Sequence, residues 1–151
     1  VKGDNVLLEY FKNEEATSGA FNEDGYFLTG DLGVEDDQGF FFITGRKKEL
    51  IIKGGENISP REIDDTLYKH NAVLEACTFG IKDDNYGEEI SACVYLKNDL
   101  VANEKELLEL CTKDLGEYKT PSQIIFVDEP LPKGPSGKIQ RLKIASQYSR
   151  A

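Results

Sequence analysis

The chain has 151 residues and a formal net charge of −10 at pH 7, which is enough length for one hydrophobic core or for one domain with part of another attached. Such an acidic chain offers no basic patch for nucleic acid or for an anionic membrane surface, so we expect neither partner. No run of about 18 apolar residues predicts membrane insertion, and the sequence shows no signal peptide and no lipidation motif.

The three cysteines, Cys77, Cys93 and Cys111, are odd in number and widely spaced. Two of them lie in apolar, strand-like runs, a pattern that fits buried thiols in a reducing compartment better than a disulfide framework. The sequence has no metal-ligand spacing, so we expect no metal bound by this chain. These features favour a soluble protein of the cytoplasm.

The charge divides the chain near Arg46. Residues 1–45 hold ten Asp or Glu against two Lys, a net charge of −8, whereas residues 46–151 hold eighteen against sixteen Lys or Arg, a net charge of −2. In residues 1–45, short apolar stretches separated by Asp-Gly and Gln-Gly turns predict the strands of a small β unit. So acidic a segment makes a poor independent core, and we expect it to be the end of a larger domain whose other part precedes Val1.

Residues 46–151 have the pattern of a compact α+β domain. Apolar runs predict strands over 50–52, 73–81, 89–97 and 124–127. A capping box formed by Ser59 and Glu62, with Pro60 at the first helical position, predicts a helix start. Amphipathic periodicity predicts a second helix over 104–115, and a terminal helix is expected near 141–148.

Four candidate groups stand out as chemically informative. Asp31 follows a strand-like stretch and a glycine, where a carboxylate can face vicinal hydroxyls such as those of a ribose, although taken alone an ordinary turn aspartate is the better interpretation. The basic cluster 46–48 is either a site or a solvated face. His70, the only histidine, is expected at a helix end on the surface.

Lys138 lies in a glycine-marked loop. It does not fit the phosphate-binding P-loop, which needs four residues between its glycines and Ser or Thr after the lysine. Here two residues separate Gly134 from Gly137, and Ile139 follows the lysine. What remains is either a movable cation on a long side chain or a simple exposed lysine.

Taken together, four motifs in order resemble the adenylate-forming superfamily of acyl-CoA synthetases, peptide-synthetase adenylation domains and luciferases. They are Thr29-Gly30-Asp31, the segment 45–60 with its Gly-Arg-Lys-Lys-Glu and Gly-Gly-Glu-Asn-Ile-Ser-Pro strings, Tyr86-Gly87-Glu88, and Pro135-Ser136-Gly137-Lys138. The resemblance implies an α+β lid domain over 46–151, with a short β hairpin and a three-stranded sheet packed by helices. It also implies that 1–45 contributes the last β strands of the large N-terminal AMP-binding domain.

The resemblance also implies roles for single residues. Asp31 is similar to the aspartate that binds the ribose hydroxyls of ATP and AMP, and Arg46 to an arginine that also contacts the nucleotide. Lys138 is similar to the catalytic lysine of the first half-reaction. Lys48 falls at the hinge about which the small domain swings.

Gly54 and Gly55 resemble the glycines that line the pantetheine tunnel of CoA after that swing. Some relatives carry a further functional lysine at the position of Ile52, and this role is not transferred to Lys53. The Gly-Gly-Glu-Asn-Ile-Ser-Pro wording favours CoA as the acceptor, with a carrier-protein thiol as the alternative.

The implied reaction joins a carboxylate to ATP, used with magnesium, to give acyl-AMP and pyrophosphate, and then transfers the acyl group to CoA. The family's phosphate loop and its adenine and carboxylate pockets would precede Val1, so we expect the chain alone to be inactive and to need the large N-terminal domain as partner. The pattern also resembles the oxalate and peroxisomal CoA-synthetase branch, but no pocket residue identifies the acid. The competing hypothesis is a non-catalytic module that docks on a carrier or partner protein; joint retention of Asp31, Arg46 and Lys138 favours the ligase.

Overall fold

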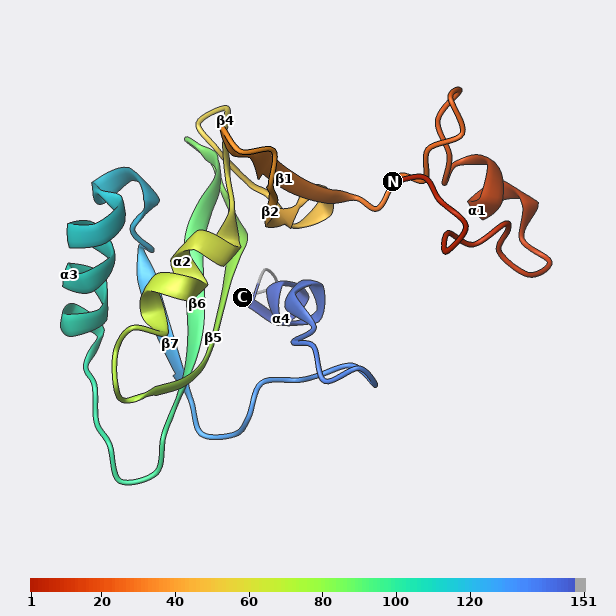
Figure 1. The fold of residues 1–151 in the computed structure, drawn as a ribbon. Coiled ribbons are helices and arrows are strands. Elements are labelled where there is room, and N and C mark those ends of the chain that lie inside the picture. The colour runs from red at the N-terminus through yellow and green to blue at the C-terminus, as the bar shows by residue number, and fades with distance from the viewer. Residues whose placement is uncertain (149–151) are drawn as a thin grey trace. The chain divides into compact units, whose positions relative to one another are not determined.

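The computed structural model describes residues 1–148 and divides the chain into two compact units, Val1–Ile43 and Thr44–Ala151 (Figure 1). Residues 149–151, the end of the predicted domain 46–151, lie outside the described residues. The division falls a few residues before Lys48, the predicted hinge position.

The first unit contains one short helix and a two-stranded sheet. Helix α1 (Glu14–Ser18) begins at Asn13, whose side chain accepts the Ala16 N–H. Strands β1 (Asp31–Glu35) and β2 (Phe41–Arg46) pair with each other, and β2 continues into the second unit. The apolar, strand-like stretch before Asp31, residues 26–28, forms no strand and contributes an isolated bridge between Phe21 and Phe27. Asp31 therefore opens a strand instead of following one.

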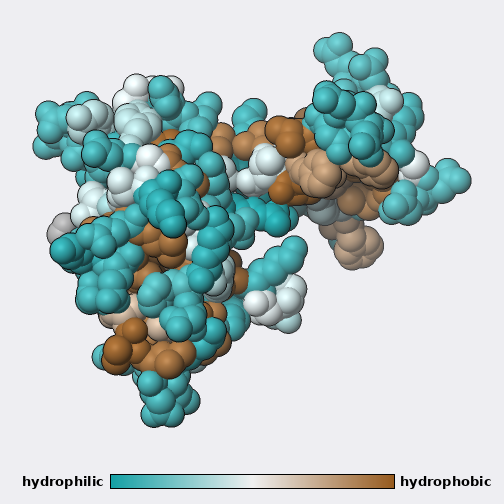
Figure 2. Space-filling model, turned by 60° about the vertical axis from the view of Figure 1, so that its left-hand side comes forward, coloured by the Kyte–Doolittle hydropathy of each residue, from teal (hydrophilic) through white to brown (hydrophobic). Residues whose placement is uncertain are grey.

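The first unit leaves most of its large apolar side chains exposed. Among residues 1–43, all of which are described, Ala20 is the one buried hydrophobic residue. Part of this apolar surface is drawn in brown in Figure 2. The exposed side chains are Val1, Leu7, Leu8, Tyr10, Phe11, Tyr26, Leu28, Val34, Phe40, Phe41, Phe42 and Ile43. A segment that exposes this much apolar surface needs further protein to cover it, in line with the poor core expected from its composition.

The second unit is built on a five-stranded sheet with the order β4-β3-β6-β5, in which β7 also pairs with β6. The strands are β3 (Ile51–Lys53), β4 (Glu56–Ile58), β5 (Val73–Asp83), β6 (Gly87–Leu96) and β7 (Gln123–Val127). The hairpin β3–β4 and the three-stranded sheet β5–β6–β7 confirm the predicted fold. One pairing, Lys53 with Gly87, joins hairpin and sheet into a continuous whole.

Helices cover both faces of this sheet (Figure 1). Helices α2 (Pro60–Leu67) and α3 (Glu104–Leu115) enclose the larger core, and α4 (Arg141–Tyr148) encloses a smaller one. Successive side chains of β6 point to opposite faces of the sheet and so belong to both cores. Ala92 and Val94 lie in the larger core, and Cys93 lies in the smaller one. The sheet, packed on both faces, can therefore support the loops at its two ends.

The predicted capping box at the start of α2 is wrong. The Ser59 hydroxyl donates to the Thr44 carbonyl at 2.7 Å and makes no cap bond, while Glu62 pairs with Lys119. Pro60, with its fixed φ and no N–H to satisfy, starts the helix without that cap. The box that does form lies at α3, where the Asn103 side chain accepts the Glu106 N–H and the Glu106 carboxylate accepts the Asn103 N–H.

Candidate functional site

Lys138 lies exposed on a small, internally bonded loop. Lys133 and Ile139 form a β bridge across its base, and the Gly134 N–H donates to the Lys138 carbonyl at 2.9 Å. Gly137 has φ +77°, a backbone conformation that disfavours a side chain, and its N–H donates to the Gly134 carbonyl at 2.9 Å. The backbone of Lys138 is thus fixed while its ammonium group remains in solvent.

A buried carboxylate holds the N-terminal side of this loop. Glu75 on β5 is 9% exposed and accepts the Leu131 N–H at 2.7 Å. The same carboxylate forms an ion pair with the Lys133 ammonium group. Glu75 lies on β5 next to a register shift between Val73 and Glu75, and its carboxylate ties the segment leading to Lys138 to the sheet.

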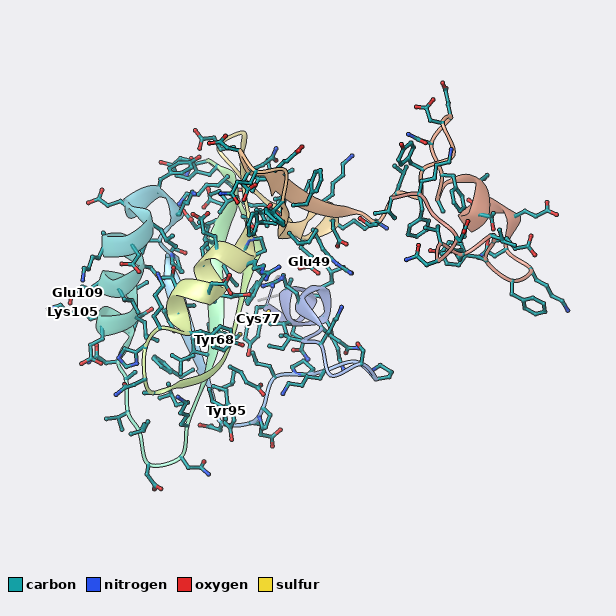
Figure 3. The ribbon with its side chains drawn as sticks, viewed as in Figure 1. Glu49, Tyr68, Cys77, Tyr95, Lys105 and Glu109 are labelled. Carbon is teal, nitrogen blue, oxygen red and sulfur yellow. The ribbon has the colours of Figure 1, made fainter. Side chains whose placement is uncertain are left out.

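Arg141 holds the C-terminal side of the loop, at the first residue of α4. Its Nε lies 2.9 Å from Oε2 of Glu49, and its Nη2 lies 2.9 Å from Oδ2 of Asp64. Its Nη1 also donates to the Thr78 carbonyl at 2.5 Å. Figure 3 labels Glu49, which lies beside α4. One guanidinium group therefore joins α4 to α2, to β5 and to the 3-10 helix η1 (Lys47–Glu49).

The Arg141 cluster is a largely buried ion-pair network. Burial is the largest single influence and lowers the pKa of Arg141, but the charge of Asp64 and the hydrogen bonds to Asp64 and Glu49, with other neighbours, together raise that pKa above its ordinary value. Burial raises the pKa of Asp64 from its ordinary value, against the opposing effects of Arg141 and of the Thr78 N–H, which donates to Asp64 Oδ1 at 2.6 Å. Both oxygens of the Asp64 carboxylate thus have a donor, the Thr78 N–H and Nη2 of Arg141. Removing either partner would leave an uncompensated buried charge.

Sequence reasoning missed this cluster. The signal that could have found it is the position of Arg141: a cation in the first turn of a helix opposes the helix dipole, so it requires another reason to be there. Asp64, an acidic residue that is 7% exposed on α2, is its partner.

The three thiols are buried, and their raised pKa values make them unreactive at neutral pH. Burial raises the pKa of Cys77 to about 12 and the pKa values of Cys93 and Cys111 to about 11. All three are free and fully covered, as the sequence predicts. The thiolate is the reactive form, so none of them is a nucleophile at neutral pH.

Gly54 and Gly55 form the turn between β3 and β4, with φ +56° and +87°. The Gly54 N–H donates to the Tyr86 carbonyl at 2.8 Å. A Cβ atom at Gly54 would lie 2.9 Å from the hydroxyl oxygen of Tyr118, which itself donates to the Lys53 carbonyl at 2.5 Å. A side chain at Gly54 is therefore disfavoured by the backbone angle and would also displace the Tyr118 hydroxyl.

Gly55 differs from Gly54 because a Cβ atom there would meet nothing within 4 Å. Its backbone faces open space, where an extended ligand could approach closely. The adjacent Lys53 is not available to such a ligand. Its ammonium group pairs with Glu89 at 2.6 Å and lies over the rings of Tyr86 and Tyr118, 5.7 and 5.2 Å from their centroids.

The glycine turn and the Lys138 loop are anchored at different ends of β5. The turn lies at the Asp83 end, where Lys53 pairs with Gly87, and the loop is tied to Glu75. With a strand rise of about 3.3 Å per residue, Glu75 and Asp83 are roughly 26 Å apart. The Glu75 anchor of the loop and the Asp83 end of β5 are thus well separated along the sheet.

The remaining candidates, Asp31, Arg46 and Lys48, are divided between the two units. Asp31 belongs to the first unit, is partly exposed, and its N–H donates to the Thr29 hydroxyl at 3.1 Å. Arg46 ends β2 and Lys48 lies in η1; both belong to the second unit and both are exposed. Lys48 is the chain neighbour of Glu49, the partner of Arg141.

These features define a class of protein. It is a small α+β domain in which one sheet supports the Gly54–Gly55 turn near one end and is also bonded to the loop that contains Lys138. Residues 62–138 match the AMP-binding enzyme C-terminal domain, and the chain belongs to this family.

The chain is similar to the sulfoacetate–CoA ligase of Cupriavidus necator, with 49% identity over 95% of the chain and 28% of that protein. It is similar to the oxalate–CoA ligase of Saccharomyces cerevisiae, with 41% identity over 100% of the chain and 28% of that protein. Among solved structures, ATP-bound MatB from Rhodopseudomonas palustris superposes with a TM-score of 0.89 at 34% identity, over 98% of the chain and 29% of that structure's chain.

The chain thus spans somewhat more than a quarter of the length of these relatives. Within residues 1–148, no helix is both long and apolar enough to cross a membrane. In the same part of the chain, His, Cys, Asp and Glu form no group of three or more that could hold a metal ion.

Proposed function

We propose that the chain is the C-terminal part of an ATP-dependent acyl-CoA ligase of the AMP-forming type. The observation that carries this proposal is Lys138, exposed on a loop that is tied down on both sides in a domain of this family. Residues 1–45 would complete the large AMP-binding domain, and residues 46–151 would be the mobile domain. Buried free thiols are compatible with a cytoplasmic enzyme.

In the first half-reaction, an oxygen of the substrate carboxylate attacks the α-phosphate of ATP, and pyrophosphate leaves with the electrons of the broken P–O bond. Two anions approach each other in this step, so a cation at the reacting centre lowers the barrier. Lys138 would supply this charge. Asp31 would bind the ribose hydroxyls and Arg46 would contact the nucleotide, with magnesium accompanying ATP.

In the second half-reaction, the CoA thiol attacks the acyl carbonyl of the adenylate, and AMP leaves. The bare backbone of Gly55, with open space beside it, would line the path of the pantetheine arm next to Gly54. Since the glycine turn and the Lys138 loop are anchored at different ends of one sheet, both cannot face the same adenylate at once. A turn about Lys48 would bring them there in succession.

The acyl group is left unassigned. The relatives are named for different acids, sulfoacetate and oxalate, although they match almost the whole of this chain. The residues that choose the acid would therefore lie in the large domain. CoA is the proposed acceptor, and a carrier-protein thiol is the alternative outcome of the test below.

The test places the chain in a complete enzyme. The chain replaces the matching C-terminal segment of the sulfoacetate–CoA ligase of Cupriavidus necator, to which it is 49% identical. Sulfoacetyl-CoA formation is measured for this chimera, for the intact ligase, and for the ligase lacking that segment. We expect a monodisperse chimera with activity well above the truncated ligase, and a Lys138→Ala chimera that loses pyrophosphate release.

A folded chimera that is no more active than the truncated ligase would overturn the proposal. So would a Lys138→Ala chimera with undiminished pyrophosphate release, because the cation would then have no part in adenylation. Transfer to a carrier-protein thiol but not to CoA would replace the acceptor.

A further inference from the structure

Arg141 is the point at which the Lys138 loop meets the chain next to the proposed hinge. Its side chain is 15% exposed and contacts Glu49, whose own side chain is 27% exposed. The two residues are 92 positions apart in sequence. Along the covalent chain, then, Lys48 and Lys138 are separated by most of the domain, whereas through this ion pair they are separated by a few residues.

We propose that Arg141 is a positioning residue for Lys138, acting by fixing the start of α4 to Glu49 beside the hinge and to Asp64 on α2. The inference rests on the proposed function and adds the device by which a rotation about Lys48 is passed to the lysine as one rigid movement. Arg141 itself touches neither substrate nor nucleotide in this role.

A lysine needs such support more than most groups. Its ammonium group is a point charge on a flexible stem, so the location of the charge depends on how well the backbone beneath it is held. A misplacement of about 1 Å at a reacting centre can cost on the order of 100-fold in rate. Arginine suits the anchoring task because its planar fork binds several acceptors at fixed angles. Here Nε, Nη1 and Nη2 each have a separate partner.

The sharpest perturbation is Glu49→Gln in the chimera described above. It removes one charge at a partly exposed position and leaves the contacts of Arg141 with Asp64 and the Thr78 carbonyl in place, so the domain keeps its fold. Arg141→Lys is the second variant, which retains a cation but loses the fork. Lys105→Gln is the matched control, since it breaks an exposed pair with Glu109 on the outer face of α3 (Figure 3).

Two half-reactions are measured separately: pyrophosphate release with sulfoacetate and ATP, and thioester formation from presynthesised sulfoacetyl adenylate and CoA. We expect Glu49→Gln and Arg141→Lys to lower the kcat of pyrophosphate release by about tenfold or more, in line with a misplaced charge. Thioester formation should change less than about twofold, because that step uses the glycine turn, which is anchored elsewhere on the sheet. Lys105→Gln should leave both rates unchanged.

A double-mutant cycle shows whether the effect passes through Lys138. In a Lys138→Ala background, Glu49→Gln and Arg141→Lys should have no further effect on pyrophosphate release, because there is no longer a cation to misplace. An equal loss with and without Lys138, an equal loss in both half-reactions, or no loss at all would overturn the inference. If Lys138→Ala itself has no effect, the proposed function fails; if Lys138→Ala lowers pyrophosphate release and the cycle is additive, only the inference fails.

Discussion

The glycine turn allows a quantitative test of stability. Gly54 and Gly55 both have a positive φ, but their surroundings differ. In Gly55→Ala the new methyl group meets nothing within 4 Å, and φ +87° is the only penalty. In Gly54→Ala the methyl group would also lie 2.9 Å from the Tyr118 hydroxyl oxygen, closer than real Cβ contacts allow. Tyr118 must move, and its hydrogen bond to the Lys53 carbonyl is then lost.

A Cβ atom in the left-handed region costs about 1–2 kcal/mol, from which the reduced entropy of the unfolded chain returns about 0.4–1 kcal/mol. Gly55→Ala should therefore destabilise the second unit by about 1 kcal/mol. Gly54→Ala has a similar strain cost, and the lost hydrogen bond adds about 1 kcal/mol. The cleanest quantity is the interaction with Tyr118→Phe, which removes the oxygen atom that the methyl group would strike.

Urea unfolding followed by far-UV circular dichroism measures these free energies on the chain as it stands. In the Tyr118→Phe background, Gly54→Ala should cost about 1 kcal/mol less than in the parent, whereas the cost of Gly55→Ala should be the same in both backgrounds. If Gly54→Ala costs the same with and without the tyrosine hydroxyl, the steric reasoning is wrong. In the chimera, Gly55→Ala should nevertheless slow thioester formation, since the proposed function places CoA in the space beside it.

Three further predictions follow from the described contacts. Asn103→Ala should lower the free energy of unfolding by about 1 kcal/mol because it removes the working capping box of α3, while the loss from Ser59→Ala should involve no helix cap; hydrogen exchange at the first turns of α2 and α3 separates the two. The three buried thiols should resist alkylation by iodoacetamide at pH 8 and react fully in denaturant; they are Cys77, Cys93 and Cys111. Because burial raises their pKa values, their contribution to the free energy of unfolding should be lost only as the pH rises toward 11. The hydrogen bond from Lys69 lowers the pKa of Asp114, so its stabilising contribution is present at neutral pH and is lost as the pH falls through that lowered value; a carboxyl resonance of Asp114 that titrates at its ordinary pKa would contradict the contact.

The helices and strands that could be predicted are those whose pattern lies in consecutive residues of the sequence. Helix α3 has the predicted bounds, 104–115, because its apolar period and its cap are both written in consecutive residues. Strands β5 and β6 were predicted from their long apolar runs, and they extend to Asp83 and Gly87 because the turn between them is tight. The capping box at α2 failed because the Thr44 carbonyl, distant in sequence, binds the Ser59 hydroxyl instead.

The residues of the candidate site also differ in whether the sequence indicates them. Lys138, Gly54 and Gly55 stand out in the sequence because glycine patterns are local and the resemblance gives them a context, although their roles stay predictions. The groups that hold them in place have no such local pattern. Asp64 and Arg141 are 77 positions apart, and although a cation in the first turn of a helix is unusual, nothing near Arg141 in the sequence indicates which carboxylate it pairs with.

The way these groups are held also bears on why a single small domain could serve two steps. The glycine turn is stabilised by hydrogen bonds and by the rings around Lys53, whereas the Lys138 loop is stabilised by ion pairs of Glu75 and Arg141 with buried or partly buried partners. The turn is tied to β6 through Gly87 and Glu89, whereas the loop is tied to β5 through Glu75 and Thr78, so the two sets of contacts share no residue. Substitutions that loosen one element should therefore leave the other intact, because distant sites without common partners are nearly additive in free energy. Within one small domain, the two half-reactions can then be adjusted separately.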